Sequence, residues 1–243
     1  MQSKVQAQET FEGDGVVVNR LFPIAQRMNL DPFVLWDHFN LEPGHGFPDH
    51  PHRGFEAITY LFSGGMNHAD NLGNNTFVSA GGAQVFCAGS GLVHSEMPAE
   101  KVRSSGIQLW INLAKSDKNI DPSYQQIQAE QLPIEHFDGG RCVHIVGGGS
   151  PIKLHSQITY QHLILASQSS YSLALQRGTS AIIYVVKGAV QIETEVLESH
   201  QAWLIEDSEQ DALRIAVQQD SELMFCMGAP RGEPIRQRGP FVD

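Results

Sequence analysis

The stretch Gly54–Phe62 (GFEAITYLF), which ends at the turn residues Ser63-Gly64-Gly65, is the part of the sequence that decides the fold. Its β-branched and aromatic residues, followed at once by glycine, predict a buried strand and a tight turn. Eight residues of this region, Ala57–Gly64 (AITYLFSG), have a counterpart 124 positions later in Ala181–Gly188 (AIIYVVKG). Because this offset is about half of the 243-residue chain, we interpret the match as an internal duplication of a β domain.

Further strand signals lie on either side of this segment. Gly15–Arg20 (GVVVNR) is rich in β-branched residues, and Met66–Ala69 is predicted to form a strand that ends at the turn Asn71–Asn75 (NLGNN). Ile107–Leu113 (IQLWINL) alternates in a way that puts its aliphatic residues on one face of a strand. Helix candidates are few, so short strands joined by turns are expected throughout.

Two segments are predicted to be irregular. The Gln-rich Tyr124–Gln131 lacks a sustained 3.6-residue apolar period, so we expect a loop or a short turn there. Gly147–Pro151 (GGGSP) lacks the Gly-Lys-Ser/Thr of a phosphate-binding loop and is predicted to be a tight turn, near the point where a second domain takes over. We therefore predict an all-β fold of two tandem antiparallel barrels, residues 1–135 and residues 136–243.

The charge and the cysteines restrict the functional class and the location. A formal net charge of −11, without any run of Lys or Arg, argues against direct binding of nucleic acid. Cys87, Cys142 and Cys226 are odd in number and widely spaced, which predicts reduced thiols rather than a disulfide framework or a cysteine-based zinc site. Met1–Glu12 is polar, and no apolar run is long enough for a membrane span, so we expect a cytoplasmic protein that does not bind membranes.

Two short motifs carry the candidate chemistry. His50 and His52 form a His-x-His pair just before the strand at Gly54–Phe62, and His94 and Glu96 form a His-x-Glu pair after a Gly-Ser-Gly turn. In extended chain, residues i and i+2 point to the same side. Two such pairs on neighbouring strands therefore present three imidazoles and one carboxylate to a single metal ion. Alone, each pair is also compatible with histidines that merely form surface hydrogen bonds.

This ligand set suits several divalent metals. It is hard enough for iron or manganese and rich enough in nitrogen for nickel, copper, cobalt or zinc. Four protein ligands on an octahedral ion leave positions for water, oxygen or substrate, whereas a structural zinc site is closed and usually contains cysteine. The duplication restricts the site to one half of the chain, because adding 124 to His50 and His52 gives Ala174 and Gln176.

The motifs resemble those of the pirin family, and the resemblance spans nearly the whole chain. It is carried by these segments: Asp31-Pro32-Phe33, His50–Glu56 (HPHRGFE), Thr59-Tyr60-Leu61, Ala88–Pro98 (AGSGLVHSEMP), Pro234-Ile235 and Gly239–Val242 (GPFV). The resemblance implies two tandem cupin (jelly-roll) barrels with one mononuclear metal, most commonly iron(II), in the N-terminal barrel. It implies His50, His52, His94 and Glu96 as metal ligands. It also implies that Glu56, although it follows the general cupin pattern, supports the site or the strand pairing and does not bind the metal.

Two functions follow from this resemblance. Some pirins act as quercetin 2,3-dioxygenases, which implies a flavonol-like aromatic substrate, O2 and a catalytic role for Glu96 as the base that accepts the substrate hydroxyl proton. Other members are metal- or redox-dependent regulators that bind a protein partner. A third interpretation, a metal that only stabilises the barrel, is disfavoured by the open coordination expected from the ligand set.

Several other residues are candidates for the surroundings of the metal. Cys87 stands where relatives usually have a different residue, and it is either a small buried hydrophobe or part of the cavity wall. His68 is expected to be a surface or hydrogen-bonded histidine, with a place beside the metal as the alternative, and His38 and His45 are not expected to bind it. Three aromatic residues can line a pocket for an aromatic substrate or belong to the core: Trp36, Phe47 and Phe55.

Overall fold

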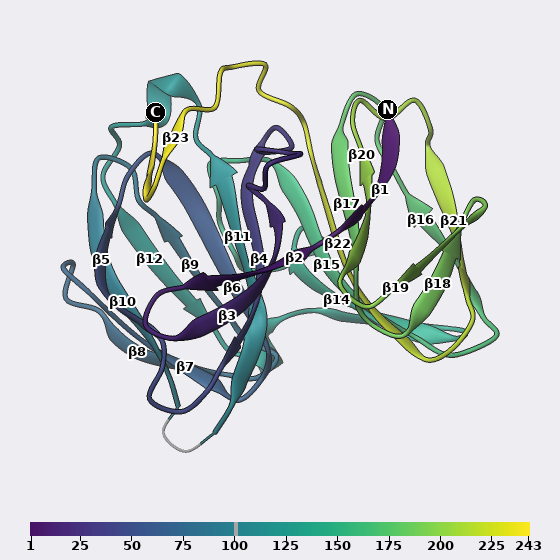
Figure 1. Cartoon of the computed structure of the whole chain (residues 1–243), viewed down its shortest axis with the longest axis horizontal. Helices are drawn as coiled ribbons and strands as arrows, with labels where there is room; N and C mark the ends of the chain where they lie inside the picture. Colours follow the sequence, from purple (N-terminus) through teal and green to yellow (C-terminus); the bar gives the residue numbers. More distant parts are fainter. Residues whose placement is uncertain (100–101) are drawn as a thin grey trace. The chain divides into compact units, whose positions relative to one another are not determined.

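The computed structural model describes residues 1–99 and 102–243, and its paired strands form antiparallel ladders throughout. The chain divides into two compact units (Figure 1). We call the first the N-terminal barrel; it comprises Gln8–Gln131, Leu154–Ser156 and Arg231–Asp243. We call the second the C-terminal barrel; it comprises Met1–Ala7, Leu132–Lys153 and Gln157–Pro230.

The N-terminal barrel consists of a seven-stranded and a four-stranded sheet. The seven-stranded sheet has the spatial order β12 (Ser123–Ile127), β9 (Ala83–Cys87), β6 (Phe55–Ser63), β11 (Ser104–Asn112), β4 (Phe33–Leu41), β3 (Val16–Phe22), β2 (Gln8–Glu12). The four-stranded sheet has the order β5 (Phe47–His52), β10 (Leu92–Pro98), β7 (Gly65–Asp70), β8 (Asn75–Ser79). The short hairpin of β23 (Gln237–Arg238) and β24 (Phe241–Val242) also belongs to this unit.

Apolar side chains form two buried clusters in this barrel, and one of them packs against the histidines described below. Val18, Leu61, Met66 and Val78 belong to one buried cluster that joins the seven-stranded sheet to β7 and β8. Side chains alternate between the inside and the outside of the barrel along each strand. The same alternation sets the direction of the polar side chains described below.

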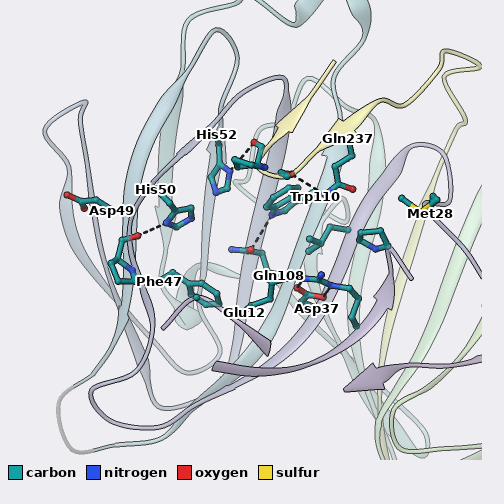
Figure 2. A pocket seen from close by; sticks show the side chains of 17 residues that line it. Glu12, Met28, Asp37, Phe47, Asp49, His50, His52, Gln108, Trp110 and Gln237 are labelled. Carbon is teal, nitrogen blue, oxygen red and sulfur yellow. Dashed lines mark hydrogen bonds and ion pairs between the residues drawn. The ribbon is translucent and has the colours of Figure 1, made fainter. Parts of the chain in front are cut away.

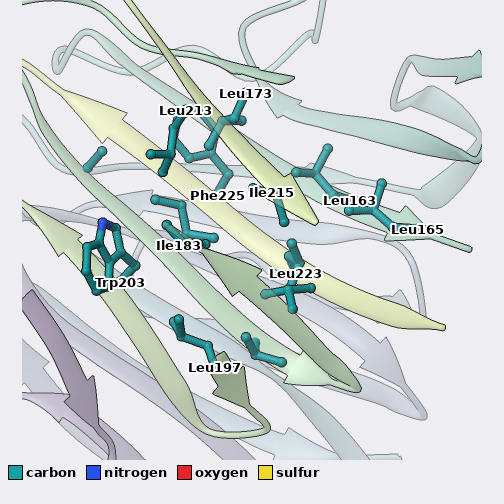
Figure 3. Close-up of a cluster of buried hydrophobic side chains, with 14 of the residues drawn as sticks. Leu163, Leu165, Leu173, Ile183, Leu197, Trp203, Leu213, Ile215, Leu223 and Phe225 are labelled. Atoms are coloured by element: carbon teal, nitrogen blue, oxygen red, sulfur yellow. The ribbon is translucent and has the colours of Figure 1, made fainter. Parts of the chain in front are cut away.

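The C-terminal barrel has the same two-sheet plan. Its seven-stranded sheet has the order β1 (Gln2–Gln6), β20 (Gln201–Ile205), β17 (Ser180–Lys187), β22 (Ser221–Gly228), β15 (Ile158–Leu165), β14 (Gly140–Val146), β13 (Ile134–Phe137). Its four-stranded sheet has the order β16 (Ser170–Ala174), β21 (Ala212–Val217), β18 (Ala189–Ile192), β19 (Glu195–Glu198). Leu173, Ile183, Leu213, Ile215 and Phe225 lie in one continuous hydrophobic core inside it (Figure 3).

The strand order confirms the duplication inferred from the sequence. β6 and β17, which carry the two copies of the repeated segment, occupy the third position of their seven-stranded sheets. The four-stranded sheets correspond in the same way, so β5 matches β16 and β10 matches β21. The interior positions of β21 hold the aliphatic Leu213 and Ile215, which leaves no ligand-type side chain at this place in the second barrel.

Three expectations need correction or refinement. Tyr124–Gln131 is not simply a loop, because Ser123–Ile127 forms β12 at the edge of a sheet and Ala129–Gln131 forms the short 3-10 helix η2. Polar residues are common on edge strands, which explains why an apolar pattern is lacking there. The triple glycine is a turn as predicted, but it lies within the C-terminal barrel. The main change from one unit to the other falls between residues 131 and 132 rather than at 135, and residues 1–7 and 231–243 belong to the unit formed mainly by the other half of the sequence.

The remaining elements are minor. A second 3-10 helix, η1 (Lys115–Asp117), follows β11 in the N-terminal barrel. All three cysteines are free and buried. Across the part of the chain that the structure describes, no helix is both long enough and apolar enough to cross a membrane.

Candidate metal centre

β5 and β10 bring the two predicted motifs together. They are neighbours in the four-stranded sheet, and His94 lies directly opposite His50 in the register. Because side chains alternate along a strand, His50 and His52 project to the same face of the sheet, and His94, opposite His50, projects to that face as well. The register shifts between the pairs His94–His50 and Glu96–Phe47, where β5 has one residue more than β10. β10 itself stays regular there, since it pairs with β7 without a shift, so His94 and Glu96 keep the same face. The expected placement of the two pairs on neighbouring strands is thus what the structure has.

The three imidazoles converge on one point. The Nε2 atoms of His50 and His94 are 3.1 Å apart. One ring nitrogen from each of His50, His52 and His94 lies within 4.8 Å of those from the other two. His52 and His94 are buried, whereas His50 is half-buried and faces the cavity described below.

In His50 and His52 the other ring nitrogen, Nδ1, is held by a backbone carbonyl. Nδ1 of His50 donates to the carbonyl of Pro48 at 2.7 Å, and Nδ1 of His52 donates to the carbonyl of Pro240 at 3.3 Å. A proton on Nδ1 leaves a lone pair on Nε2, so both rings present an acceptor to the point of convergence. Nε2 of His52 is buried and has no hydrogen-bond partner among the residues described.

His94 is oriented by a second histidine and a carboxylate. Nε2 of His68 lies 2.9 Å from Oδ2 of Asp70, and the side chains of both residues are fully buried. With Nε2 of His68 donating to Asp70, Nδ1 of His68 is the acceptor for Nδ1–H of His94 at 3.4 Å. The His68 ring also stacks on Tyr124 at a centroid distance of 4.0 Å. The chain of contacts therefore leaves the Nε2 lone pair of His94 directed at His50.

Glu96 is held by three donors. Its Oε1 accepts from Thr59 Oγ1 at 3.0 Å and from Nε2 of Gln84, and its Oε2 accepts from Nε2 of Gln108 at 2.7 Å. A carboxylate oxygen has two lone pairs, so Oε1 is fully used while Oε2 retains one. Oε2 is also the oxygen that lies 4.0 Å from Nε2 of His94.

The electrostatic setting keeps two of the imidazoles neutral. Burial, reinforced by His94 and His50, lowers the pKa of His52 to about 3. Burial, reinforced by His50 and His68, lowers the pKa of His94 to about 2. A neutral imidazole with a free Nε2 lone pair is the form that binds a metal ion.

These residues fit a divalent metal ion. Several Nε2 lone pairs facing one another at short range repel unless a cation lies among them, and the buried Nε2 of His52 needs a partner of this kind. The hydrogen bonds on the far side of each ring are the supporting contacts typical of metal-bound histidines. The donor set of imidazole nitrogen plus carboxylate oxygen suits iron, manganese, cobalt, nickel, copper and zinc.

A cavity of about 620 Å³ opens beside the histidines (Figure 2). His50 and His52 form part of its wall, together with Gln108, Trp110 and Phe47. Such a volume is in the range of sites that enclose small organic ligands. Phe47 lines the cavity, which is one of the two alternatives that the sequence left open, and also packs against a core cluster.

Three other candidates do not line this cavity. Trp36 is completely buried, and Phe55 is buried behind the wall, where it stacks on Trp110 at a centroid distance of 4.1 Å. Cys87 pairs with Glu56 across β9 and β6 and is absent from the lining. Trp110, which the sequence analysis did not single out, provides the aromatic surface instead.

Charged residues line another part of the cavity. Arg20 forms a two-point contact with Asp37, through Nε to Oδ1 at 2.8 Å and Nη2 to Oδ2 at 2.6 Å. The same Nη2 lies 2.6 Å from Oε1 of Glu12. Because the guanidinium is shared by two carboxylates, this part of the wall offers acceptors to a ligand rather than a free cation.

The C-terminal hairpin closes one side of the site. Gln237, Gly239 and Pro240 line the cavity, and the Pro240 carbonyl is the partner of His52. Nζ of Lys118 anchors the hairpin by donating to the carbonyls of Val242 at 2.9 Å and of Gly54 at 2.8 Å. An ion pair of 2.7 Å between Arg53 and Asp243 adds a surface contact.

Sequence reasoning missed most of the supporting residues. Asp70, Gln84, Gln108 and Pro240 lie on other strands or late in the sequence, and only their positions in the fold bring them to the histidines. His68 forms a hydrogen bond, as expected, but is buried against His94 rather than on the surface. His38 and His45 contact Ser105 and the Asp14 carbonyl, respectively, and not the histidine cluster.

Two tandem jelly-roll barrels, with a histidine-rich site in the first and an apolar core in the second, define a bicupin. The chain belongs to the pirin family, since the Pirin profile matches residues 15–111 and the Pirin C-terminal cupin domain matches residues 160–243. It is 34% identical to a pirin-like protein of Solanum lycopersicum, covering 98% of this chain and 84% of the relative. It is also 34% identical to human Pirin, covering 98% of this chain and 85% of that one.

A solved structure of quercetin 2,3-dioxygenase from Acinetobacter baumannii has a similar fold. The TM-score is 0.89 at 27% sequence identity, and the alignment covers 99% of this chain and 90% of that chain.

Proposed function

We propose that this chain is a metal-dependent dioxygenase of the quercetin 2,3-dioxygenase type, acting on a flavonol or a similar small aromatic substrate with O2. The observation that carries the proposal is the convergence of His50, His52 and His94 at the wall of a cavity with aromatic lining. The likeness to the quercetin 2,3-dioxygenase of A. baumannii supports the same assignment. Membership of the pirin family is compatible with it but does not select the reaction.

In this proposal His50, His52, His94 and Glu96 hold one divalent ion, with iron(II) expected first and nickel, manganese, copper, cobalt or zinc as substitutes. When bound, such an ion supplies a Lewis acid that favours the ionised form of a hydroxyl beside it. The one free lone pair of Glu96, on Oε2, would serve either the ion or a proton, so Glu96 would accept the hydroxyl proton when this oxygen is released from the ion. Gln108 lines the cavity and contacts this oxygen, so it fixes the position of the base relative to the substrate.

The cavity wall suggests how the ring system is bound. Phe47 and Trp110 offer apolar surface to flat rings, and Nε1 of Trp110 is engaged by Oε1 of Gln108 at 3.2 Å, which fixes the indole. Glu12 and Asp37 offer acceptors to phenolic hydroxyl groups at the polar part of the wall. In the overall reaction both atoms of O2 enter the ring-opened product and one ring carbon leaves as carbon monoxide.

Aerobic turnover of quercetin tests the proposal. The purified protein is stripped, reloaded separately with iron(II), nickel(II) or manganese(II), and assayed for quercetin loss, oxygen uptake and carbon monoxide. Turnover should exceed that of the free ion, and it should fall strongly in Gln108→Leu while metal content stays unchanged, because this variant loses the contact with Glu96 but keeps every proposed ligand. Lack of turnover above free metal in all loaded forms would refute the dioxygenase proposal.

A regulatory role is the second candidate, and one observation favours it. His52 contacts the carbonyl of Pro240 in the partly exposed C-terminal hairpin, so a change of charge at the ion reaches this segment through a single hydrogen bond. Hydrogen exchange of residues 231–243 should then differ between oxidised and reduced iron-loaded protein. A pull-down with the loaded wild type and with His94→Ala provides the second step, and equal recovery of partners by both proteins would argue against metal gating.

A further inference from the structure

A second group of ligand-type side chains lies on the other face of the β6–β9 pair. Glu56 and Cys87 are opposite one another in the register of these strands. Their neighbours Phe55 and Phe86 contact the ring of His52, at centroid distances of 5.1 and 5.4 Å. Because side chains alternate, Glu56 and Cys87 point away from the three-histidine cluster. The sequence analysis expected Glu56 to support either that cluster or the strand pairing, and of these two the structure has the strand pairing.

His155 completes the second group. One ligand atom each of Glu56, Cys87 and His155 lies within 4.8 Å of those of the other two. Oε1 of Glu56 accepts from the backbone amide of His155 at 2.8 Å and from its Nδ1 at 3.2 Å, and Oε2 accepts from the amide of Ser156 at 2.9 Å. The segment Leu154–Ser156 is thereby held against the sheet by one carboxylate.

The three side chains have the burial expected of a built site with an entrance. Glu56 and Cys87 are 1% and 4% exposed, whereas the His155 side chain is 49% exposed. Oε2 of Glu56 accepts one hydrogen bond and keeps one lone pair for an ion. The His155 ring contacts Oε1 of Glu56, and a rotation of this ring would turn a nitrogen toward the ion instead. A thiolate, an imidazole and a carboxylate are the three ligand types that zinc takes in proteins.

A nucleophilic Cys-His-Glu arrangement is the competing interpretation, and the geometry disfavours it. A reactive cysteine needs both a thiolate and solvent access. Burial, reinforced by Glu56, raises the pKa of the Cys87 thiol to about 12. His155 directs Nδ1 to Glu56 rather than to the sulfur. A divalent cation, by contrast, removes the thiol proton on binding and balances the buried carboxylate.

We propose that Glu56, Cys87 and His155 form a second metal site, which takes a thiophilic divalent ion such as Zn²⁺ with water as the remaining ligand. The ion joins β6, β9 and the segment Leu154–Ser156, so its role is to fix this segment to the sheet. The site shares no ligand with the three-histidine cluster. The proposal is therefore independent of the dioxygenase assignment.

Cobalt(II) binding to the full-length protein tests the proposal. Cobalt bound to a thiolate gives a near-ultraviolet charge-transfer absorption that cobalt bound only to histidine and carboxylate lacks. The metal-free wild type should bind a second equivalent of cobalt together with this absorption. Cys87→Ser should lose both, whereas Cys142→Ser, which changes another buried cysteine, should keep both.

Two further variants separate the sites and protect the test against misfolding. His155→Ala changes a half-exposed side chain and should lose the absorption without loss of the fold. The double variant His50→Ala/His94→Ala should lose the other equivalent of cobalt and keep the absorption. The proposal is overturned if the wild type gives no thiolate absorption, or if the absorption persists in Cys87→Ser or in His155→Ala.

Discussion

His94 lies directly opposite His50 across β10 and β5, with their Nε2 atoms 3.1 Å apart. In an antiparallel ladder, directly opposed residues are the closest cross-strand neighbours, so backbone pairing brings these two side chains together. The proposed ligands are therefore pre-organised by the sheet. The supporting hydrogen bonds then decide which ring nitrogen carries the lone pair.

Replacement of His94 should abolish the stabilisation of the protein by metal. If the ion binds only the folded state, adding it at about 100 times its dissociation constant raises the free energy of unfolding by about 2.7 kcal/mol. The test uses a Cys87→Ser background, which removes the second proposed site. Thermal or urea unfolding should show this increase when His94 is present and none after His94→Ala. His136→Ala, which changes an exposed histidine of the C-terminal barrel, should respond like the wild type. An unchanged response of His94→Ala would contradict the proposed ligand set.

Asp70 should tune the affinity of the site through His68. Asp70→Asn removes the negative charge that holds His68 in the tautomer that accepts from His94, and loss of such supporting partners typically lowers metal affinity by about 10–100-fold. Competition with a chelator of known affinity measures the effect.

Asn74→Ala is the matched control for this prediction. It removes hydrogen bonds to Asp70 but leaves the Asp70–His68 pair intact. The control should therefore bind metal with nearly the wild-type affinity. Equal losses in Asp70→Asn and Asn74→Ala would indicate that the loop, and not the histidine tautomer, controls affinity.

The metal-free protein should lose stability in acid because of its buried histidines. The folded-state pKa values of His52 and His94, about 3 and about 2, lie below the ordinary value of 6.5. Below pH 6.5 the unfolded chain takes up protons that the folded chain does not, so the free energy of unfolding falls as pH decreases toward these values. The expected slope is about 1.4 kcal/mol per pH unit for each histidine.

Urea unfolding of the metal-free protein at several pH values between 7 and 4 measures this slope. His52→Phe is a suitable control, because the ring of His52 already packs against Phe86 and Trp110. This variant should have a shallower slope than the wild type. Identical slopes would mean that the pKa of His52 does not differ between the folded and the unfolded protein.

Lys118 should link the C-terminal hairpin to the metal site. Lys118→Met keeps the aliphatic stem but loses the contacts with Val242, Gly54 and Asn112, and a hydrogen bond to a charged group contributes about 1.5–3 kcal/mol. The variant should be less stable and should bind metal more weakly, since the hairpin also carries the partner of His52. Lys115→Met, at an exposed position nearby, should have little effect on either measurement. If Lys118→Met binds metal with wild-type affinity, the hairpin does not contribute to metal binding.

The sequence was informative where the signal is local. Alternation in Ile107–Leu113 and the glycine after Phe62 specify strand and turn within a few residues, and the structure confirms both as β11 and the end of β6. The two short motifs could be recognised because i and i+2 share a face in any strand. The repeat could be recognised because both copies, β6 and β17, are buried strands at the same place in their sheets and therefore keep similar apolar residues.

The remainder depends on pairings that no local pattern specifies. His155 approaches Glu56 from 99 positions away, and Pro240 approaches His52 from 188 positions away. The edge strand β12 has no apolar alternation, because its pairing with β9 needs only the backbone. The assignment of each terminus to the opposite barrel likewise arises from long-range pairing, in which β1 joins β20.

The contact between His52 and Pro240 has a consequence for biogenesis. The carbonyl that orients this histidine is synthesised 188 residues after it, which at ~5–20 residues per second is a delay of roughly 10–40 s. A nascent chain thus carries its proposed ligands long before it carries the residue that sets the tautomer of one of them. Capture of the ion in its final state must therefore wait until the hairpin of β23 and β24 has been synthesised and has folded onto the barrel that was made first.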